Sequence, residues 1–74
     1  MQEGYLGYNY KNKRYGFLVR DLWENDGFHC GDTFEVKING EWVKTRIEMT
    51  TDGEWYLINT NLEGDDLEHR EIRL

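Results

Sequence analysis

Residue types that often perform catalysis come together once in this chain, at His29 and Cys30, with Asp32 close behind. A Cys–His pair is reactive when the imidazole faces the thiol and a third group orients the imidazole. Neighbours on an extended chain point to opposite faces, which works against that arrangement. A zinc site needs four ligands in paired spacings, and the chain has neither a C-x-x-C nor an H-x-x-x-H motif. We therefore expect a small buried cysteine beside an exposed histidine, and no bound metal.

Carboxylates crowd the segment from residue 61 to residue 71. Paired acids perform general acid–base chemistry when a pocket raises the pKa of one of them. A calcium loop would need the D-x-D-x-D-G pattern, which this segment lacks. The acids alternate with Gly64, His69 and Arg70, as in a solvated acidic loop, so we expect no enzyme activity and no cofactor. They are Glu63, Asp65, Asp66, Glu68 and Glu71.

A tryptophan among basic residues is the strongest candidate for a binding site. Trp42 shares an alternating segment with Lys44 and Arg46, and Lys37 lies on the preceding segment. An aromatic side chain among cations can anchor a protein partner, or stack on a nucleic-acid base while the cations contact phosphate. Alternatively, the Lys and Arg stems cover the indole through cation–π contact, or the last strand covers it. We predict that Lys37, Trp42, Lys44 and Arg46 form a partner-binding surface.

The strands that position these residues are the best-defined part of the chain. Residues 33–38 and 41–50 alternate apolar and polar side chains on either side of Asn39-Gly40. Asn-Gly favours a two-residue type I′ turn, which fixes the register of the paired strands. We also expect an ion pair between Glu35 and Lys44. The predicted pairs are Ile38–Glu41, Val36–Val43 and Phe34–Thr45 on the core side, and Lys37–Trp42, Glu35–Lys44 and Thr33–Arg46 on the outer side.

The register after this hairpin stays open. Asp52-Gly53 can form a second two-residue turn, which pairs Met49 with Tyr56 and leaves Trp55 and Leu57 outside. A bulge at the turn would invert this arrangement and bury both. The sequence fits either register.

The flanking segments predict further short strands. Residues 4–10 and 14–20 alternate around a polar turn and predict a hairpin, in which Gly7 and Gly16 indicate bulges or close backbone approach. A final strand is expected at Glu71–Leu74. The first and last strands are expected at the sheet edges, where unpaired backbone would allow a weak homodimer as the alternative to a monomer.

Residues 21–32 form the longest irregular stretch. They contain turn-forming residues, yet Leu22, Trp23 and Phe28 are too apolar for a free loop. We expect this stretch to fold over one end of the protein as a lid.

Together these elements predict an all-β fold. Five or six short strands without helical periodicity indicate a single domain over residues 1–74, a small and strongly bent antiparallel barrel of the SH3-like kind. An open antiparallel sheet or an OB-like barrel is the alternative. One cysteine cannot form an internal disulfide, so the core must come from the aromatic side chains: three Trp, five Tyr and three Phe.

Charge and composition narrow the expected partners. Fifteen acids against nine bases give a net charge of −6, which argues against a generic nucleic-acid binder. The lone cysteine and the absence of a long apolar run favour a cytoplasmic protein with no membrane contact. We expect a non-enzymatic interaction module that binds a protein partner. Binding of single-stranded nucleic acid is the alternative, and an acidic mimic of DNA ranks third because the charge is modest.

Four motifs make the chain similar to a known family: Cys30-Gly31-Asp32, the turn from Gly40 to Trp42, Arg46-Ile47-Glu48 and Trp55-Tyr56-Leu57. From about Tyr5 to Leu74, the chain resembles a family of short bacterial domains of unknown function. The resemblance implies an accessory protein of Gram-positive bacteria, often encoded among conjugative and other mobile elements. It implies no activity and no catalytic residues. The acidic segment is longer than the family pattern.

Overall fold

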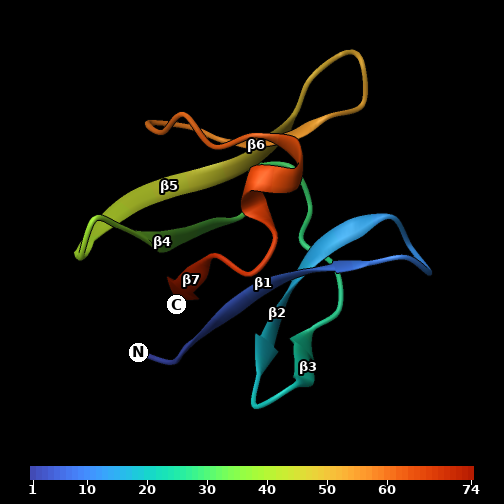
Figure 1. The fold of residues 1–74 in the computed structure, drawn as a ribbon. Coiled ribbons are helices and arrows are strands. Elements are labelled where there is room, and N and C mark those ends of the chain that lie inside the picture. The colour runs from blue at the N-terminus through green and yellow to red at the C-terminus, as the bar shows by residue number, and fades with distance from the viewer.

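The computed structural model describes all 74 residues, which form seven β-strands and one short 3₁₀ helix. The elements are β1 (Glu3–Asn9), β2 (Arg14–Val19), β3 (Leu22–Asn25), β4 (Thr33–Ile38), β5 (Glu41–Met49), β6 (Trp55–Leu57), the 3₁₀ helix η1 (Gly64–Leu67) and β7 (Glu71–Arg73). The strands form one antiparallel sheet in the order β3-β2-β1-β7-β4-β5-β6 (Figure 1). No helix is long and apolar enough to span a membrane.

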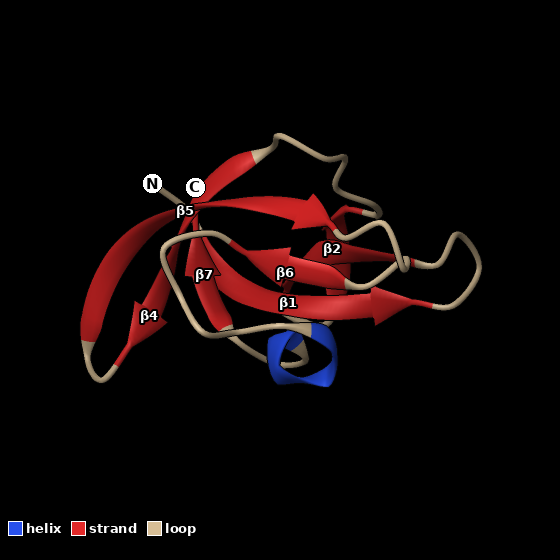
Figure 2. Cartoon of the chain, turned by 90° about the horizontal axis from the view of Figure 1, so that it is seen from above, coloured by secondary structure: helices blue, strands red, loops and turns tan.

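The sheet is strongly bent but open. In Figures 1 and 2, β4, β5 and β6 lie across from β1 and β2, and η1 lies across the open side. The end strands β3 and β6 do not pair with each other, so the sheet is not closed into a barrel. The all-β antiparallel prediction is confirmed, with seven strands instead of five or six. The SH3-like barrel is not confirmed, and the open sheet that was the alternative describes the fold.

The edge at β6 is covered by the segment that follows it in the chain. The Leu57 amide donates to the Leu62 carbonyl at 3.1 Å, and Tyr56 forms a bridge with Glu63. These contacts use the backbone groups that a closing strand would need, which is a common way to protect a sheet edge. The barrel prediction failed at this point because residues 58–63 turn back over β6.

The hairpin of β4 and β5 has the predicted register at all six positions, from Thr33–Arg46 to Ile38–Glu41. Asn39 and Gly40 have φ values of 52° and 82°, as a type I′ turn requires. Lys37, Trp42, Lys44 and Arg46 therefore occupy outward-facing positions, as predicted.

The hairpin of β5 and β6 takes the bulged register. The Gly53 amide donates to the Thr50 carbonyl, the Thr50 amide donates to the Glu54 carbonyl, and Gly53 has a φ of 85°. This is a three-residue loop whose last residue is left-handed. Met49 consequently pairs with Trp55, and both Trp55 and Leu57 are buried. A two-residue turn at Asp52-Gly53 is therefore excluded.

Residues 21–32 do not form a lid. They contain β3, which pairs with β2 through a two-residue turn at Arg20-Asp21. Both turn residues have positive φ, 54° and 63°, although neither is Gly or Asn. Leu22 and Trp23 are 72% and 42% exposed, and only Phe28 of the three predicted anchors is buried. The turn was missed because Arg seldom adopts a positive φ, and because the pair lacks the Gly that usually occupies the second position of such a turn.

Gly7 and Gly16 face each other in β1 and β2, and the indole of Trp23 lies against both. A Cβ atom would come within 2.8 Å of the Trp23 Cζ3 atom at Gly16 and 2.4 Å from Leu18 Cδ1 at Gly7. The close approach predicted for these glycines is confirmed. An aromatic ring over strand glycines replaces the packing that the glycines lack.

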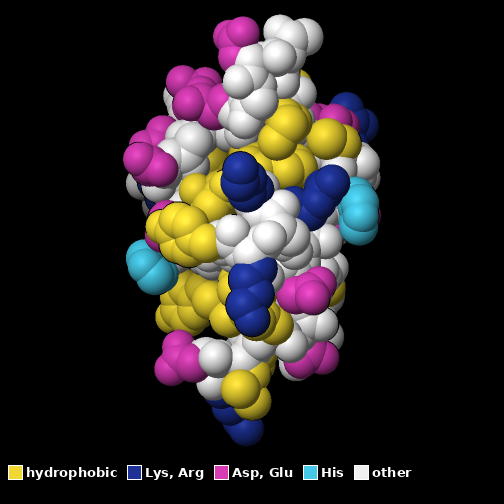
Figure 3. Space-filling view, turned by 90° about the vertical axis from the view of Figure 1, so that its right-hand side faces the viewer, with side chains coloured by type: hydrophobic (Ala, Val, Ile, Leu, Met, Phe, Trp, Pro, Cys, Tyr) yellow, Lys and Arg dark blue, Asp and Glu magenta, His cyan; other side chains and the backbone are white.

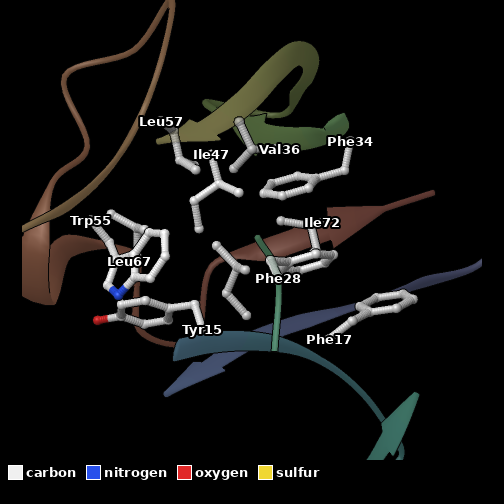
Figure 4. Packing of buried hydrophobic residues seen from close by; sticks show 11 residues of the cluster. Tyr15, Phe17, Phe28, Phe34, Val36, Ile47, Trp55, Leu57, Leu67 and Ile72 are labelled. Carbon is white, nitrogen blue, oxygen red and sulfur yellow. The ribbon is translucent and has the colours of Figure 1, made fainter. Parts of the chain in front are cut away.

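The core lies between the two sides of the bent sheet (Figure 4). Eleven buried apolar or aromatic residues form one cluster, including Leu67 from η1 and Ile72 from β7. Thr45 is the buried polar residue in this region, and its hydroxyl donates to the Ile58 carbonyl at 2.7 Å. The core thus has no unpartnered side-chain polar atom.

The strands expected at the edges lie inside the sheet. β1 pairs with β2 and β7, and β7 pairs with β1 and β4. Homodimer formation through residues 4–10 or 71–74 would require unpaired backbone that these strands do not have. The predicted dimer route is therefore wrong, because β3 and β6 are the end strands.

The turn at Asn39-Gly40 can be tested through its backbone conformation. A Cβ added at Gly40 would meet nothing within 4 Å, so Gly40→Ala should act only through the left-handed φ. We expect a loss of about 1 kcal/mol in the free energy of unfolding, measured with urea. Gly40→Asn is the control and should cost less, because Asn tolerates this region. Equal losses for both variants would contradict the explanation.

Tyr15 is the one ionisable residue of the core, and its hydroxyl donates to the Gly64 carbonyl at 3.0 Å. Burial, followed by the charges of Glu68 and Asp65, raises the pKa of Tyr15 from 10.0 to about 12. Tyr15 therefore loses its proton at a lower pH in the unfolded chain than in the folded protein. The protonated Tyr15 hydroxyl contributes its full stabilisation of the fold below about pH 10, and this contribution is lost as the pH rises towards 12.

This pH dependence can be measured by urea unfolding at neutral pH and between pH 10 and 12. We expect Tyr15→Phe to be about 1 kcal/mol less stable near pH 7, because it lacks the hydrogen bond to Gly64. The variant should then lose less stability than the wild type over the alkaline range. Parallel losses in the two proteins would show that Tyr15 does not cause the alkaline unfolding.

Candidate partner-binding site

The outer face of β4, β5 and β7 carries all four residues predicted to bind a partner. Lys37 and Trp42 are direct neighbours across the β4–β5 hairpin, and Lys44 and Arg46 follow on β5. β7 lies on the other side of β4 and adds Glu71 and Arg73 to this face. We call the surface formed by Lys37, Trp42, Lys44, Arg46 and Arg73 the Trp42 face.

Trp42 is half-buried beneath two cations. The Arg73 guanidinium lies 4.5 Å from the centroid of the Trp42 ring, and the Lys37 ammonium lies 5.4 Å from it. Both distances are within the range of a cation–π contact. The sequence left two ways in which the indole could be covered, by a basic side chain or by the last strand. Both are present, because Lys37 and Arg73 of β7 each cover part of the ring. The ring is held in place and remains partly accessible.

The ion pairs of this face differ from the prediction. Glu35 does not pair with Lys44, because its carboxylate accepts a hydrogen bond of 2.5 Å from Arg73 on the neighbouring β7. Lys37 pairs with Glu71 at 3.8 Å. These contacts connect β7 to β4 through side chains as well as through the backbone.

Lys44 and Arg46 are the exposed cations of the face. Lys44 has no carboxylate within 4.0 Å, since Glu35 is bound to Arg73. Arg46 donates to the Glu48 carboxylate at 2.7 Å, and its side chain remains 47% exposed. Lys44 is therefore the basic group with the least intramolecular compensation.

A hollow of about 430 Å³ adjoins the Trp42 face. Lys44, Arg73 and Glu35, which is bound to Arg73, lie on its wall together with the apolar side chains of Phe34 and Leu74. Cationic groups beside apolar surface suit a ligand that combines a carboxylate with an apolar body. The hollow extends the candidate site from the indole towards the chain termini.

Arg73, Glu35 and Glu71 contribute to the site but were not among the predicted site residues. The alternation of Glu71, Ile72 and Arg73 indicated a strand with both charges on its outer face. The strand that it joins was not determined, because pairing between distant segments leaves no local pattern. Coverage of Trp42 by the last strand was one of the alternatives, but the residue that lies over the indole could not be predicted.

The residues considered as catalytic or metal-binding groups, His29, Cys30 and Asp32, do not form a site. Cys30 is exposed together with His29, so the buried-cysteine prediction is wrong. The Asp32 carboxylate accepts from the His29 backbone amide at 2.8 Å and stabilises the local turn. No three His, Cys, Asp or Glu side chains lie close enough together to hold a metal ion.

The acidic segment is more ordered than the solvated loop that was predicted. Glu63 and Asp66 form a capping box around η1, and Leu67 is buried. Glu68 accepts a hydrogen bond from the Tyr8 amide at 3.1 Å. Asp65 and Asp66 remain exposed, and Glu71 belongs to β7.

Comparison with known proteins identifies relatives without an assigned activity. A family model described as a domain of unknown function (DUF5348) matches residues 4–74. A crystal structure of a protein from Ruminococcus gnavus, a structural-genomics target, is 35% identical in sequence and has a TM-score of 0.82. The similarity covers 99% of this chain and 100% of that chain. No curated protein is significantly similar. The expected resemblance to a family of unknown function is confirmed.

The ion pair between Arg73, whose guanidinium lies over Trp42, and Glu35 can be tested by a double-mutant cycle. Arg73→Met retains an aliphatic stem but removes the contact with Trp42 and the bond to Glu35. We expect it to lower the free energy of unfolding by about 1–2 kcal/mol, and to show a coupling of about 1 kcal/mol with Glu35→Gln. Lys44→Met is the control and should change stability by less than about 0.5 kcal/mol, since Lys44 has no ion pair. Additive effects of the two substitutions would contradict the interaction.

Proposed function

This chain belongs to the DUF5348 family of domains of unknown function, and from that premise we propose that it is a non-enzymatic module that docks a protein partner on the Trp42 face. The observation that carries the proposal is an indole in contact with two cations, Lys37 and Arg73, beside Lys44, which has no ion pair. Aromatic and arginine side chains with restricted mobility are the residues that contribute most to protein interfaces. The proposed role is that of a cytoplasmic accessory protein.

The restricted geometry of Trp42 supports binding. Arg73 is fixed by Glu35, and its guanidinium lies over the indole, so the ring has little conformational freedom to lose when a partner docks. A side chain that is already ordered costs less entropy on association. The Trp42 face thus offers a flat and partly apolar anchor at the centre of a charged rim.

The charges of the face favour an acidic partner segment. Lys44 is exposed without an ion pair, and the adjoining hollow places Arg73 beside the apolar side chains of Phe34 and Leu74. A carboxylate of the partner would pair with Lys44, and a neighbouring apolar side chain of the partner would enter the hollow. We propose an acidic segment with an apolar anchor as the occupant.

Single-stranded nucleic acid is the alternative ligand for the same face. The cations that would contact phosphate are interleaved with the carboxylates of Glu35, Glu48 and Glu71, which reduce the local positive charge. Because phosphate neutralisation supplies most of the affinity for nucleic acid, these carboxylates disfavour a strand with a phosphate at every nucleotide more than a partner that places one carboxylate at Lys44. Mimicry of DNA by the acidic surface ranks third, and the association with mobile elements stays a prediction.

The proposal can be tested by affinity capture from a host lysate with tagged wild type, Trp42→Ala, Lys44→Glu and Lys11→Glu. Lys11 is exposed in the β1–β2 turn and gives a control with the same change in charge. We expect at least one protein to bind wild type and Lys11→Glu, and to lose at least about tenfold in recovery with the other two variants. If all four baits capture the same proteins in equal amounts, the Trp42 face is not the binding site and the proposal is wrong.

Nuclease treatment of the lysate separates the two ligand classes. Recovery that survives nuclease supports the protein partner, whereas recovery that disappears supports the alternative. In that case, binding of an oligonucleotide should weaken with salt, with a slope of about −0.7 per phosphate contact for a single strand.

A further inference from the structure

A second depression lies at the other end of the molecule, between the β1–β2 turn and the β5–β6 loop. It has a volume of about 490 Å³ and also reaches η1. Figure 3 looks onto this end of the molecule and shows hydrophobic side chains at the surface, with acidic side chains beside them and Lys or Arg side chains among them. None of the residues of the Trp42 face lines it. We call it the tyrosine cleft.

The apolar wall of the tyrosine cleft is aromatic. The ring of Tyr8 packs edge-on against the rings of Tyr10 and Tyr15, with centroid distances of 4.9 and 5.1 Å. Trp55 completes the wall and lies close to Tyr15 in Figure 4. Tyr15 and Trp55 are buried and Tyr8 is half-buried, whereas Tyr10 is exposed at the rim.

Hydrogen bonds between distant segments hold this wall in place. The Tyr15 hydroxyl donates to the Gly64 carbonyl at 3.0 Å, and the Trp55 indole N–H donates to the Lys13 carbonyl at 3.2 Å. The Glu68 carboxylate accepts from the Tyr8 amide at 3.1 Å. The cleft therefore exists before any ligand binds, which lowers the cost of binding.

The remainder of the lining is strongly acidic. Its carboxylates belong to Asp52, Glu54, Asp65 and Glu68, and its one basic side chain is Lys13. None of the four carboxylates has a basic group within 4.0 Å. Burial raises the pKa of Tyr15, which is part of the aromatic wall, and the charges of Glu68 and Asp65 raise it further. The lining of the cleft thus carries more negative than positive charge.

We propose that the tyrosine cleft is a binding site for a single lysine or arginine side chain presented by a partner polypeptide. The aliphatic stem would pack on the aromatic wall, and the charged head would lie among the carboxylates near the ring faces. Aromatic rings attract organic cations through their quadrupole, and the attraction grows when the cation is partly desolvated. The Arg14 guanidinium, which is 5.6 Å from the Trp55 ring centroid, shows that a ring of this wall already accepts such a contact from outside the cleft.

The shape of the cleft distinguishes this ligand from other cations. A metal ion would need at least three oxygen, nitrogen or sulfur ligands close together, and no such group of His, Cys, Asp or Glu exists in the structure. The acids are spread around an aromatic surface, which suits a long amphipathic cation. Lys13 lies on the rim and should compete with the ligand through like-charge repulsion.

The test is an NMR titration of the ¹⁵N-labelled protein with pentapeptides that have Lys, Arg or Gln between glycines, with blocked ends. We expect the Lys and Arg peptides to shift the Trp55 indole signal and the amide signals of Tyr8 and Tyr15, with dissociation constants on the order of 1 mM. The Gln peptide should produce no comparable shift. Equal shifts with all three peptides, or no shift up to about 20 mM peptide, would overturn the proposal.

Exposed residues provide variants that leave the wall intact. Glu54→Gln and Asp65→Asn each remove one charge and should weaken binding of the Lys and Arg peptides about three- to tenfold. Lys13→Gln should strengthen binding, and Glu24→Gln on β3 is the control that should not change it. Thermal melts monitored by circular dichroism verify that each variant is folded. If all four folded variants bind like the wild type, the shifts do not come from this cleft and the assignment is wrong.

Discussion

Three residues of β7 hold the two hairpins in one sheet, since β1 pairs with one edge of this strand and β4 with the other. Ile72 points into the core and is fully buried, whereas Glu71 and Arg73 face outward and pair with Lys37 and Glu35 on β4. Backbone pairing, apolar burial and ion pairing therefore meet in one short strand. The bend of the sheet, the shape of the core and the cover over Trp42 all depend on its position.

The parts of the fold that local chemistry determines were predictable, and the parts that depend on distant contacts were not. Asn39-Gly40 permits one tight turn, so all six strand pairs follow from it. Asp52-Gly53 fits turns of two lengths, and the burial of Trp55 selects the longer one. At Arg20-Asp21, pairing of β3 with β2 maintains a backbone conformation that these residue types disfavour, so tertiary structure overrides local preference.

The candidate sites show the same division. The outward positions of Lys37, Trp42, Lys44 and Arg46 follow from period-two alternation, but the cation nearest to the indole comes from a strand whose neighbours were unknown. The tyrosine cleft combines residues from four segments between Tyr8 and Glu68 that share no sequence motif. Two of its four acidic residues, Asp65 and Glu68, were recognised only as part of a solvated loop. Two surfaces at opposite ends of the molecule, one with Lys44 free of an ion pair and one lined by four carboxylates, could therefore not be distinguished in a net charge of −6.

The position of β7 in the chain also has a consequence for biosynthesis. The strand that lies in the middle of the sheet is the last of the seven to leave the ribosome. Until it emerges, the nascent hairpins have no shared neighbour, and the edges of β1 and β4 are unpaired and open to other chains. Completion of the sheet then requires contacts between residues as much as seventy positions apart, such as Glu3 with Arg73. The complete sheet can therefore form only after synthesis of its last strand.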